Sequence, residues 1–305
     1  MFTVLTHMAA LIACGVAWRF ARPGGVDADA TRRALTAVVY YLLLPALVLQ
    51  VLWRAPLGLD TARIAAAAAA GVLACMLASY LICRGCRTPR AVTGAAILAA
   101  AFPNATYLGL PVLEATFGTW ARSVAIQYDL FACTPLLLTV GILIAEALGT
   151  RNRTESPLAG LLRVPPLWAA VVAVALNALA VPTNDWLDGM LSMLGSGVVP
   201  LMLISLGLSL EWGSWHFTNL KAMLPVLFVQ LLLMPVVVWA VAHFIGLEGQ
   251  TLQAVVLEGA MPSMVLGVVI SDRFGLDTAL YAAAVTTSTL LSLATLPLWF
   301  HLLGG

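Results

Sequence analysis

The sequence predicts an all-α polytopic membrane protein with ten transmembrane helices, arranged as two inverted repeats of five with broken, crossing helices 4 and 9. Three observations support this class. Hydrophobic residues make up 62% of the 305 residues and charged residues only 10%, which is more apolar surface than a soluble domain can bury. The apolar residues gather in ten stretches that suit a bilayer. Prolines and Phe-Gly pairs recur at a near-constant separation in the two halves of the chain.

The ten predicted helices follow from the thickness of the bilayer core, which takes about 20 apolar residues of helix. They are Thr3–Trp18, Ala34–Leu52, Ile64–Cys83, Ala91–Leu113, Ser123–Ala145, Val164–Val181, Met190–Leu210, Ala222–Phe244, Leu252–Ile270 and Ala279–Leu302. The loops between them are short. No basic residue precedes the first stretch, so we expect an uncleaved first helix and not a signal peptide.

Basic residues are concentrated in every second predicted loop. Twelve of the 15 lie in loops that follow odd-numbered helices: Arg19, Arg22, Arg32, Arg33, Arg84, Arg87, Arg90, Arg151, Arg153, Arg163, Lys221 and Arg273. The other loops hold Arg54, Arg63 and Arg122. Cytoplasmic loops carry the excess of Lys and Arg. We therefore expect a multi-pass protein of the cell (inner) membrane with both termini extracytoplasmic.

Three pairs of landmarks predict an internal duplication. They are Pro45 with Pro200, Pro103 with Pro262, and Phe117-Gly118 with Phe274-Gly275, each pair being 155 to 159 residues apart. The longest polar loop divides the helices five and five. This gives a first repeat at 1–148, a cytoplasmic linker at 149–163 and a second repeat at 164–305. Units of five helices enter the membrane in opposite orientations, so the repeats are expected to be inverted.

Pro103 and Pro262 fall in the middle of predicted helices. Proline removes a backbone donor and clashes with the preceding turn, so each helix is expected to break or kink there. A kink would only shape helix packing. A broken helix at the bilayer midplane, by contrast, is how many secondary transporters build a binding site. Inverted repeats would bring the two breaks side by side, which favours the binding site.

The half-helices that follow the breaks begin at residues 104–106 and 263–265. Their first amides are expected to be unpaired and to lie at the positive end of the helix dipole. Helix N-termini of this kind bind carboxylates and other small anions. The predicted substrate-binding residues are Pro103, Asn104, Thr106, Gly109, Pro262, Ser263 and Met264.

At these residues the sequence resembles bacterial members of the auxin efflux carrier family. The resemblance rests on Phe102–Pro111, on Ala260–Ser263 followed by Phe274–Asp277, and on Ser288–Pro297. It implies ten helices, a five-plus-five inverted repeat with crossing broken helices, and transport of organic anions. Plant members of the family export indole acetate, and bacterial members are often described as transporters of malonate or other carboxylates.

Members of that family commonly carry an asparagine shortly after each crossover proline. Asn104 fits this pattern, whereas the ninth helix reads Ser-Met-Val-Leu-Gly at 263–267 without an asparagine. Because of this departure, we expect the ninth helix to contact the substrate through Ser263 and backbone groups.

Two carboxylates inside predicted helices are candidates for coupling to an ion. Glu258 lies one turn before Pro262, and Asp129 lies in the fifth helix beside Gln127 and Tyr128. Ionisable groups at membrane depth are costly and by default functional. Either carboxyl could hold a proton or share a cation. The alternatives are a structural carboxyl at Glu258 and a tie between the fifth helix and the broken fourth helix at Asp129.

The remaining candidates are cavity-lining residues: Tyr41, Pro45, Gln50, Gln127, Tyr128 and Thr287. No metal site is expected, because Cys83 and Cys86 form a lone pair without a second pair or a histidine partner. No nucleophile-base pair or phosphate-binding loop suggests an enzyme, and no cofactor is expected beyond a coupling H⁺ or Na⁺.

The sequence thus predicts a secondary active transporter of a small organic anion, such as malonate, working by alternating access. Two alternatives remain within transport: a sodium/bile-acid-type symporter and a cation/proton antiporter. A third, of another class, is a membrane sensor that binds a carboxylate without moving it. The expected partners are the anion and the lipid bilayer, with no nucleic acid. A homodimer is compatible with the sequence.

Overall fold

The computed structural model describes residues 2–151, 157–210 and 220–304, and its regular elements are helices. Their bounds are α1 Phe2–Ala21, η1 Pro23–Gly25, α2 Ala28–Val38, η2 Val39–Leu43, α3 Leu44–Arg54, α4 Leu59–Gly85, α5 Arg90–Ala101, η3 Ala105–Gly109, α6 Leu110–Phe117, α7 Ala121–Tyr128, η4 Asp129–Cys133, α8 Thr134–Leu136, η5 Leu137–Gly141, α9 Ile142–Leu148, α10 Pro157–Leu162, α11 Pro165–Ala178, α12 Asp185–Ser196, α13 Val198–Ser209, α14 Leu220–Phe228, η8 Val229–Leu233, α15 Met234–Phe244, α16 Gly249–Gly259, α17 Leu266–Phe274 and α18 Thr278–Leu302. The predicted all-α class is confirmed.

Six helical stretches of the described chain are long and apolar enough to cross a membrane: Ala28–Arg54, Leu59–Gly85, Ala121–Leu148, Asp185–Ser209, Ala222–Phe244 and Thr278–Leu302. They make the chain a multi-pass membrane protein. The other four predicted segments lie on α1, on α5 with α6, on α11, and on α16 with α17. The number of ten crossings stays a prediction. The predicted linker contains α10, while Arg153 and the side chain of Lys221 lie outside the described residues.

Several long helices widen for one turn into a π-helix just before a proline. The π turns η2, η3, η4 and η8 end at residues 43, 109, 133 and 233, and each is followed two residues later by Pro45, Pro111, Pro135 or Pro235. Proline cannot donate to the carbonyl four residues back, and its ring crowds that carbonyl. The chain accommodates both effects by opening the preceding turn to the wider π register. These helices therefore continue through their prolines instead of ending.

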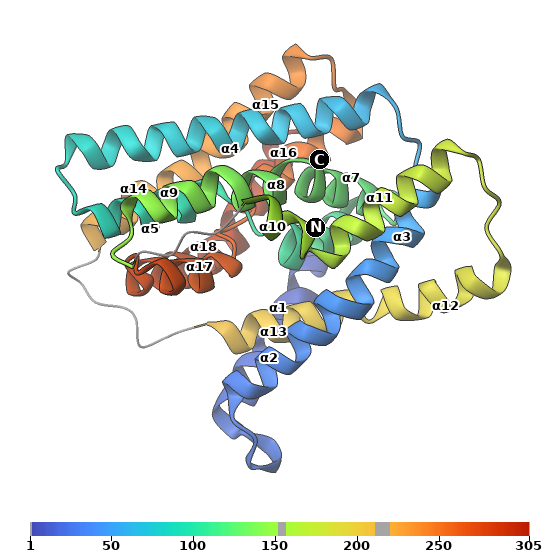
Figure 1. The fold of residues 1–305 in the computed structure, drawn as a ribbon, viewed down its shortest axis with the longest axis horizontal. Coiled ribbons are helices and arrows are strands. Elements are labelled where there is room, and N and C mark those ends of the chain that lie inside the picture. Colours follow the sequence, from blue (N-terminus) through green and yellow to red (C-terminus); the bar gives the residue numbers. More distant parts are fainter. Residues whose placement is uncertain (1, 152–156, 211–219, 305) are drawn as a thin grey trace.

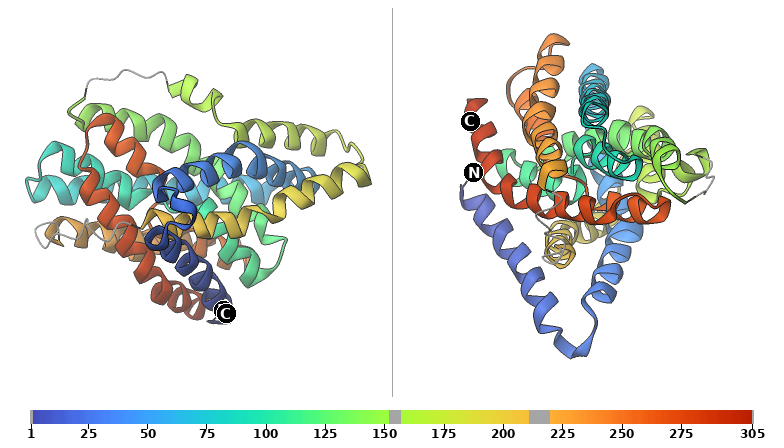
Figure 2. Two further views of the ribbon diagram at one scale, coloured as in Figure 1. Left: turned by 90° about the horizontal axis from the view of Figure 1, so that it is seen from below. Right: turned by 90° about the vertical axis from the view of Figure 1, so that its left-hand side faces the viewer.

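The helices pack in two groups, each with members from both halves of the sequence (Figures 1 and 2). The first group consists of α1, α2, α3, α11, α12 and α13. The second group contains the remaining long helices, among them α4, α5, α7, α15, α16 and α18. The sequence division at 149–163 is therefore not a division in space. The two groups meet where η3 touches α13, where α6 touches α1 and where α7 touches α3.

Each of three contacts between helix ends joins two loops that the predicted charge alternation places on the same side of the membrane. Arg151 N donates to the carbonyl of Phe274 at 3.1 Å, Asp277 N donates to that of Ala91 at 3.2 Å, and Arg54 Nη2 donates to Thr183 Oγ1 at 2.7 Å. The first two pairs lie in predicted cytoplasmic loops and the third in predicted outer loops. The N- and C-terminal ends also lie near each other at the edge of the molecule (Figure 2).

Two glycines allow a close backbone approach inside the first group. Gly15 of α1 faces Gly207 of α13, whose Cα lies 3.0 Å from the position that a Cβ at residue 15 would take. The carbonyl oxygen of Ile204 lies closer still to that Cβ position. Small residues that let helix backbones touch are a common basis of packing in membranes, where there is little hydrophobic force between helices.

We expect Gly15→Ala to destabilise the protein by about 1–3 kcal/mol, the usual cost of forcing a group into a filled core. The backbone of α13 would have to move, since no flexible side chain occupies the space. Thermal unfolding in detergent measures the change. Gly189→Ala in α12 is the matched control: a Cβ there meets nothing within 4 Å, so its midpoint should stay or rise. Equal midpoints for Gly15→Ala and wild type would contradict the close contact.

Candidate functional site

The two predicted helix breaks are present and touch each other. Helix α5 ends at Ala101 and α16 ends at Gly259, in each case just before the mid-helix proline. Between them, Asn104 N donates to the carbonyl of Pro262 at 2.7 Å, and Met264 N donates to that of Phe102 at 2.9 Å. These two bonds form a short antiparallel bridge centred on Pro103 and Ser263. The chain therefore crosses itself at two extended segments inside the helical core.

Ser263 compensates for the hydrogen bond that Pro103 cannot make. In an unbroken helix the amide of residue 103 would donate to the carbonyl of Ala99. Proline has no N–H, and the hydroxyl of Ser263 donates to that carbonyl instead, at 2.7 Å. Ser263 is fully buried, so no water could take its place there without opening the core. One break thus supplies the donor that the other lacks.

Side chains of neighbouring helices hold the second break. Gln230 in η8 donates from Nε2 to the carbonyl of Met261 at 2.7 Å. Tyr281 in α18 donates to that of Met264 at 3.1 Å. The hydroxyl of Ser288 accepts from Ser263 N at 3.1 Å. The amides of Asn104, Ser263 and Met264, which the sequence assigned to the substrate, are therefore already bonded within the protein.

The side chain of Asn104 is an unsatisfied group at the crossing. It is only 1% exposed, and neither Nδ2 nor Oδ1 has a hydrogen-bond partner among the described residues. A buried amide without partners is costly, so such a group usually binds a ligand or an ordered water. Asn104 thus offers one donor group and one acceptor directly beside the bridge.

Asp129 accepts hydrogen bonds from two hydroxyls, one of which belongs to the first break. Thr106 in η3 and Thr134 in α8 both donate to its carboxylate, Thr134 at 2.9 Å. Residues five apart lie on different faces of an α-helix but closer together in the wider π turn. The π turn η4 therefore brings Thr134 to Asp129. The carboxylate is 5% exposed and connects the fifth predicted helix to the broken fourth.

Glu258 is packed directly against Gly109. The carboxyl group occupies the space that a side chain at residue 109 would need: a Cβ there would lie 2.7 Å from Cδ of Glu258. Glu258 is 0% exposed, and neither carboxyl oxygen has a hydrogen-bond partner among the described residues. Tyr128 lies beside it, with its hydroxyl 3.4 Å from the Cβ position of Gly259 and also without a partner.

A small pocket lies at the junction of the two helix groups, next to Thr106. It is lined by Leu44, Val48, Thr106, Leu110, Ala125, Ile126 and Leu130. The free space holds roughly one water molecule. The crossing is therefore closed in this structure, and an organic acid would need the two groups to separate.

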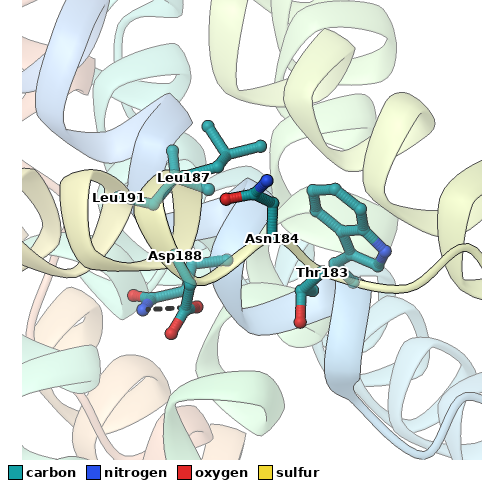
Figure 3. Close-up of a pocket in the computed structure, with 7 residues that line it drawn as sticks. Thr183, Asn184, Leu187, Asp188 and Leu191 are labelled. Atoms are coloured by element: carbon teal, nitrogen blue, oxygen red, sulfur yellow. Dashed lines mark hydrogen bonds between the residues drawn. The ribbon is translucent and has the colours of Figure 1, made fainter.

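The second helix does not place its candidates at the crossing. Tyr41 is 66% exposed, and it is the adjacent Tyr40 that interacts with Tyr107 and Asp129. Pro45 begins α3 after the π turn. Gln50 lines a different pocket, between α3 and the start of α12, where its Nε2 donates to Asp188 Oδ1 at 3.3 Å (Figure 3).

The other cavity-lining candidates are buried. Gln127 donates to Ser123 Oγ at 2.9 Å within its own helix. Thr287 contacts the sulfur of Met223 at 3.5 Å. Of these candidates, only Tyr128 lies beside the Glu258 carboxyl. Sequence reasoning gave no role to Thr134, Tyr281 or Gln230, since their contacts come from a π turn and from long-range packing.

Comparison with known proteins adds a family. A model of a membrane transport protein family matches residues 3–300. An uncharacterized transporter of Methanothermobacter thermautotrophicus is 31% identical over 282 residues, which covers 90% of each chain. An uncharacterized transporter of Methanocaldococcus jannaschii is 27% identical over 75% of this chain and 73% of its own. The uncharacterized transporter YfdV of Escherichia coli K12 is 24% identical over 75% and 74%.

Removing the Ser263 hydroxyl should destabilise the crossing. Ser263→Ala leaves the buried carbonyl of Ala99 without a donor, which costs about 1–3 kcal/mol in the free energy of unfolding. Thermal unfolding in detergent measures it. The control is Ser196→Ala, an exposed serine that bonds only within its own turn, where we expect a change within about 0.5 kcal/mol. Similar effects for the two variants would mean that the bond between the breaks is not needed.

Proposed function

The chain belongs to the membrane transport protein family, that of the auxin efflux carriers, and we propose that it is a secondary active transporter of a small organic anion. Members of this family are transporters and not enzymes. The substrate, its coupling to an ion and the transport mechanism are the proposed parts.

The observation that carries the proposal is the crossing of two broken helices with an unsatisfied amide beside it. Irregular backbone at membrane depth is tolerated only where protein or a water-filled cavity surrounds it. The bridge between Asn104 and Pro262 is buried on all sides, and Asn104 keeps a free donor and a free acceptor. An amide next to the start of a half-helix suits a carboxylate, which takes a hydrogen bond and the favourable helix dipole.

The proposed substrate-binding residues remain those around the breaks, with different roles. Asn104 and Thr106 supply side-chain groups, while Ser263, Met264 and the two prolines shape the crossing. Gly109 leaves room for the carboxyl group of Glu258 against η3. The proposed substrate is a dicarboxylate as small as malonate, which would enter once the two helix groups separate.

Alternating access is supported by the way the helices pack. The pocket beside Thr106 lies where the two groups meet, with α3 of the first group on one side and α6 and α7 of the second on the other. Separation of the groups at this junction would open the crossing to one face of the membrane. We propose that the inverted repeats at 1–148 and 164–305 make the opposite opening equivalent. A homodimer stays compatible with this arrangement.

Coupling to a proton or sodium ion is proposed to involve Glu258 and Asp129. They lie close enough to interact electrostatically and flank the crossing. Two carboxyls near one crossing are also what a cation/proton antiporter would place there. That alternative predicts cation movement in place of anion movement, and a sensor predicts binding without any movement.

The first test is counterflow of radiolabelled malonate in proteoliposomes containing the full chain. We expect exchange by the wild type and a loss of about tenfold or more in Asn104→Ala, because a hydrogen bond to a charged group contributes roughly 1.5–3 kcal/mol. Asn184→Ala, at an exposed helix start, is the control and should exchange like the wild type. Absence of malonate exchange in the wild type would reject this substrate, and binding without exchange would favour the sensor.

Orientation gives a second test. With both termini extracytoplasmic, alkaline phosphatase fused after residue 305 should be active in cells, whereas a fusion within the linker at 149–163 should be inactive. A fluorescent protein that folds only in the cytoplasm should give the opposite pattern. Phosphatase activity from the linker fusion would reverse the proposed topology.

A further inference from the structure

The two carboxyls near the crossing differ in the hydrogen bonds that reach them. Asp129 accepts from the hydroxyls of Thr106 and Thr134. Both oxygens of Glu258 are buried without a partner in the described chain. An ionised carboxylate is an acceptor only and needs donors, whereas a protonated acid has one proton of its own. The structure therefore suits a charged Asp129 and a neutral Glu258.

The surroundings of Glu258 supply no compensating charge. The elements packed on α16 are α4, α6, α7, α15, α18 and η3. The titratable groups that interact with Glu258 are Asp129, Tyr128 and Cys133, and no described arginine, lysine or histidine is among them. Gly109 lies directly against its carboxyl group. A single carboxyl in such a place binds a proton more readily than a sodium ion, which needs several oxygen ligands.

We propose that Glu258 carries the coupling proton, that Asp129 stays ionised, and that the proton and the anion cross the membrane together. This inference rests on the proposed function and names its coupling ion. When the crossing is open to one side, Glu258 takes a proton from water as the anion reaches Asn104. The proton removes one negative charge from the site, and each carboxylate of the anion adds one. When the crossing opens to the other side, the carboxyl releases the proton to water and the anion leaves.

The charges explain why the anion needs the proton. An anion beside two ionised carboxylates would put three like charges into a low dielectric, where repulsion is poorly screened. Protonation of Glu258 lowers this repulsion, and the anion in turn favours the protonated carboxyl. Each partner therefore favours binding of the other, as reciprocal linkage requires.

The test compares driven uptake with exchange in proteoliposomes, using radiolabelled malonate. For the wild type, with the membrane potential held at zero, an inward proton gradient should raise malonate accumulation by about tenfold per pH unit, as expected for one coupled proton. An inward sodium gradient at equal pH should have no effect. Glu258→Gln, which resembles the protonated acid, should keep counterflow but lose all stimulation by the proton gradient. Glu114 pairs with Arg122 in the outer part of the fold, away from the crossing. Its variant Glu114→Gln is the control and should keep the stimulation by the proton gradient.

Stimulation by sodium instead of protons, or an unchanged proton response in Glu258→Gln, would overturn the proposal. Absence of malonate exchange in the wild type would be a failure of the proposed substrate alone. A measurement without substrate then tests whether Glu258 holds a proton. Infrared spectra of the reconstituted protein at pH 7 should show the carbonyl band of a protonated carboxylic acid, lost in Glu258→Gln and kept in Asp129→Asn. Loss of that band only in Asp129→Asn would overturn the assignment.

Discussion

Every buried carbonyl in this fold needs a donor, and the mid-helix prolines remove donors inside the buried core. The Ser263 hydroxyl meets this requirement at Ala99, and the two bridge bonds meet it for Phe102 and Pro262. Because each break uses groups of the other, neither half of the crossing is satisfied alone. These bonds hold the break between α5 and α6 against the break between α16 and α17.

A crossing that satisfies its backbone still leaves selected side chains unsatisfied. Asn104 and Glu258 have unpaired polar atoms, while Asp129 is fully engaged by hydroxyls. In a stable core such groups would be a defect. We propose that in a carrier such groups exchange a bonded partner for a substrate or a proton, so that the rigid bridge and the unpaired side chains beside it serve different purposes.

The sequence was sufficient for the helical class, the multi-pass membrane character, the family and the positions of both breaks, because proline and hydrophobic length act locally. It could not show how each helix is rotated about its axis, and so which side chains face which neighbours. Tyr40 and Tyr41 are neighbours in sequence, yet only Tyr40 approaches Asp129, and Gln50 turned out to face Asp188. The contact of Gly109 with Glu258 joins residues 149 positions apart, and no local pattern announces it. The inverted repeat and the site roles stay predictions.

The π turns have a consequence for how the family can vary in length. Each holds one residue more than an α turn, and that residue rotates everything after it by about 100°. Deleting one residue from η4 would restore an ordinary helix, but it would turn Thr134 away from Asp129. A relative that lacks one residue in this turn would thus keep its membrane-spanning helix but lose a hydrogen-bond donor to the carboxylate that corresponds to Asp129. In alignments of such proteins, a single gap at a π turn is a change of chemistry as well as of length.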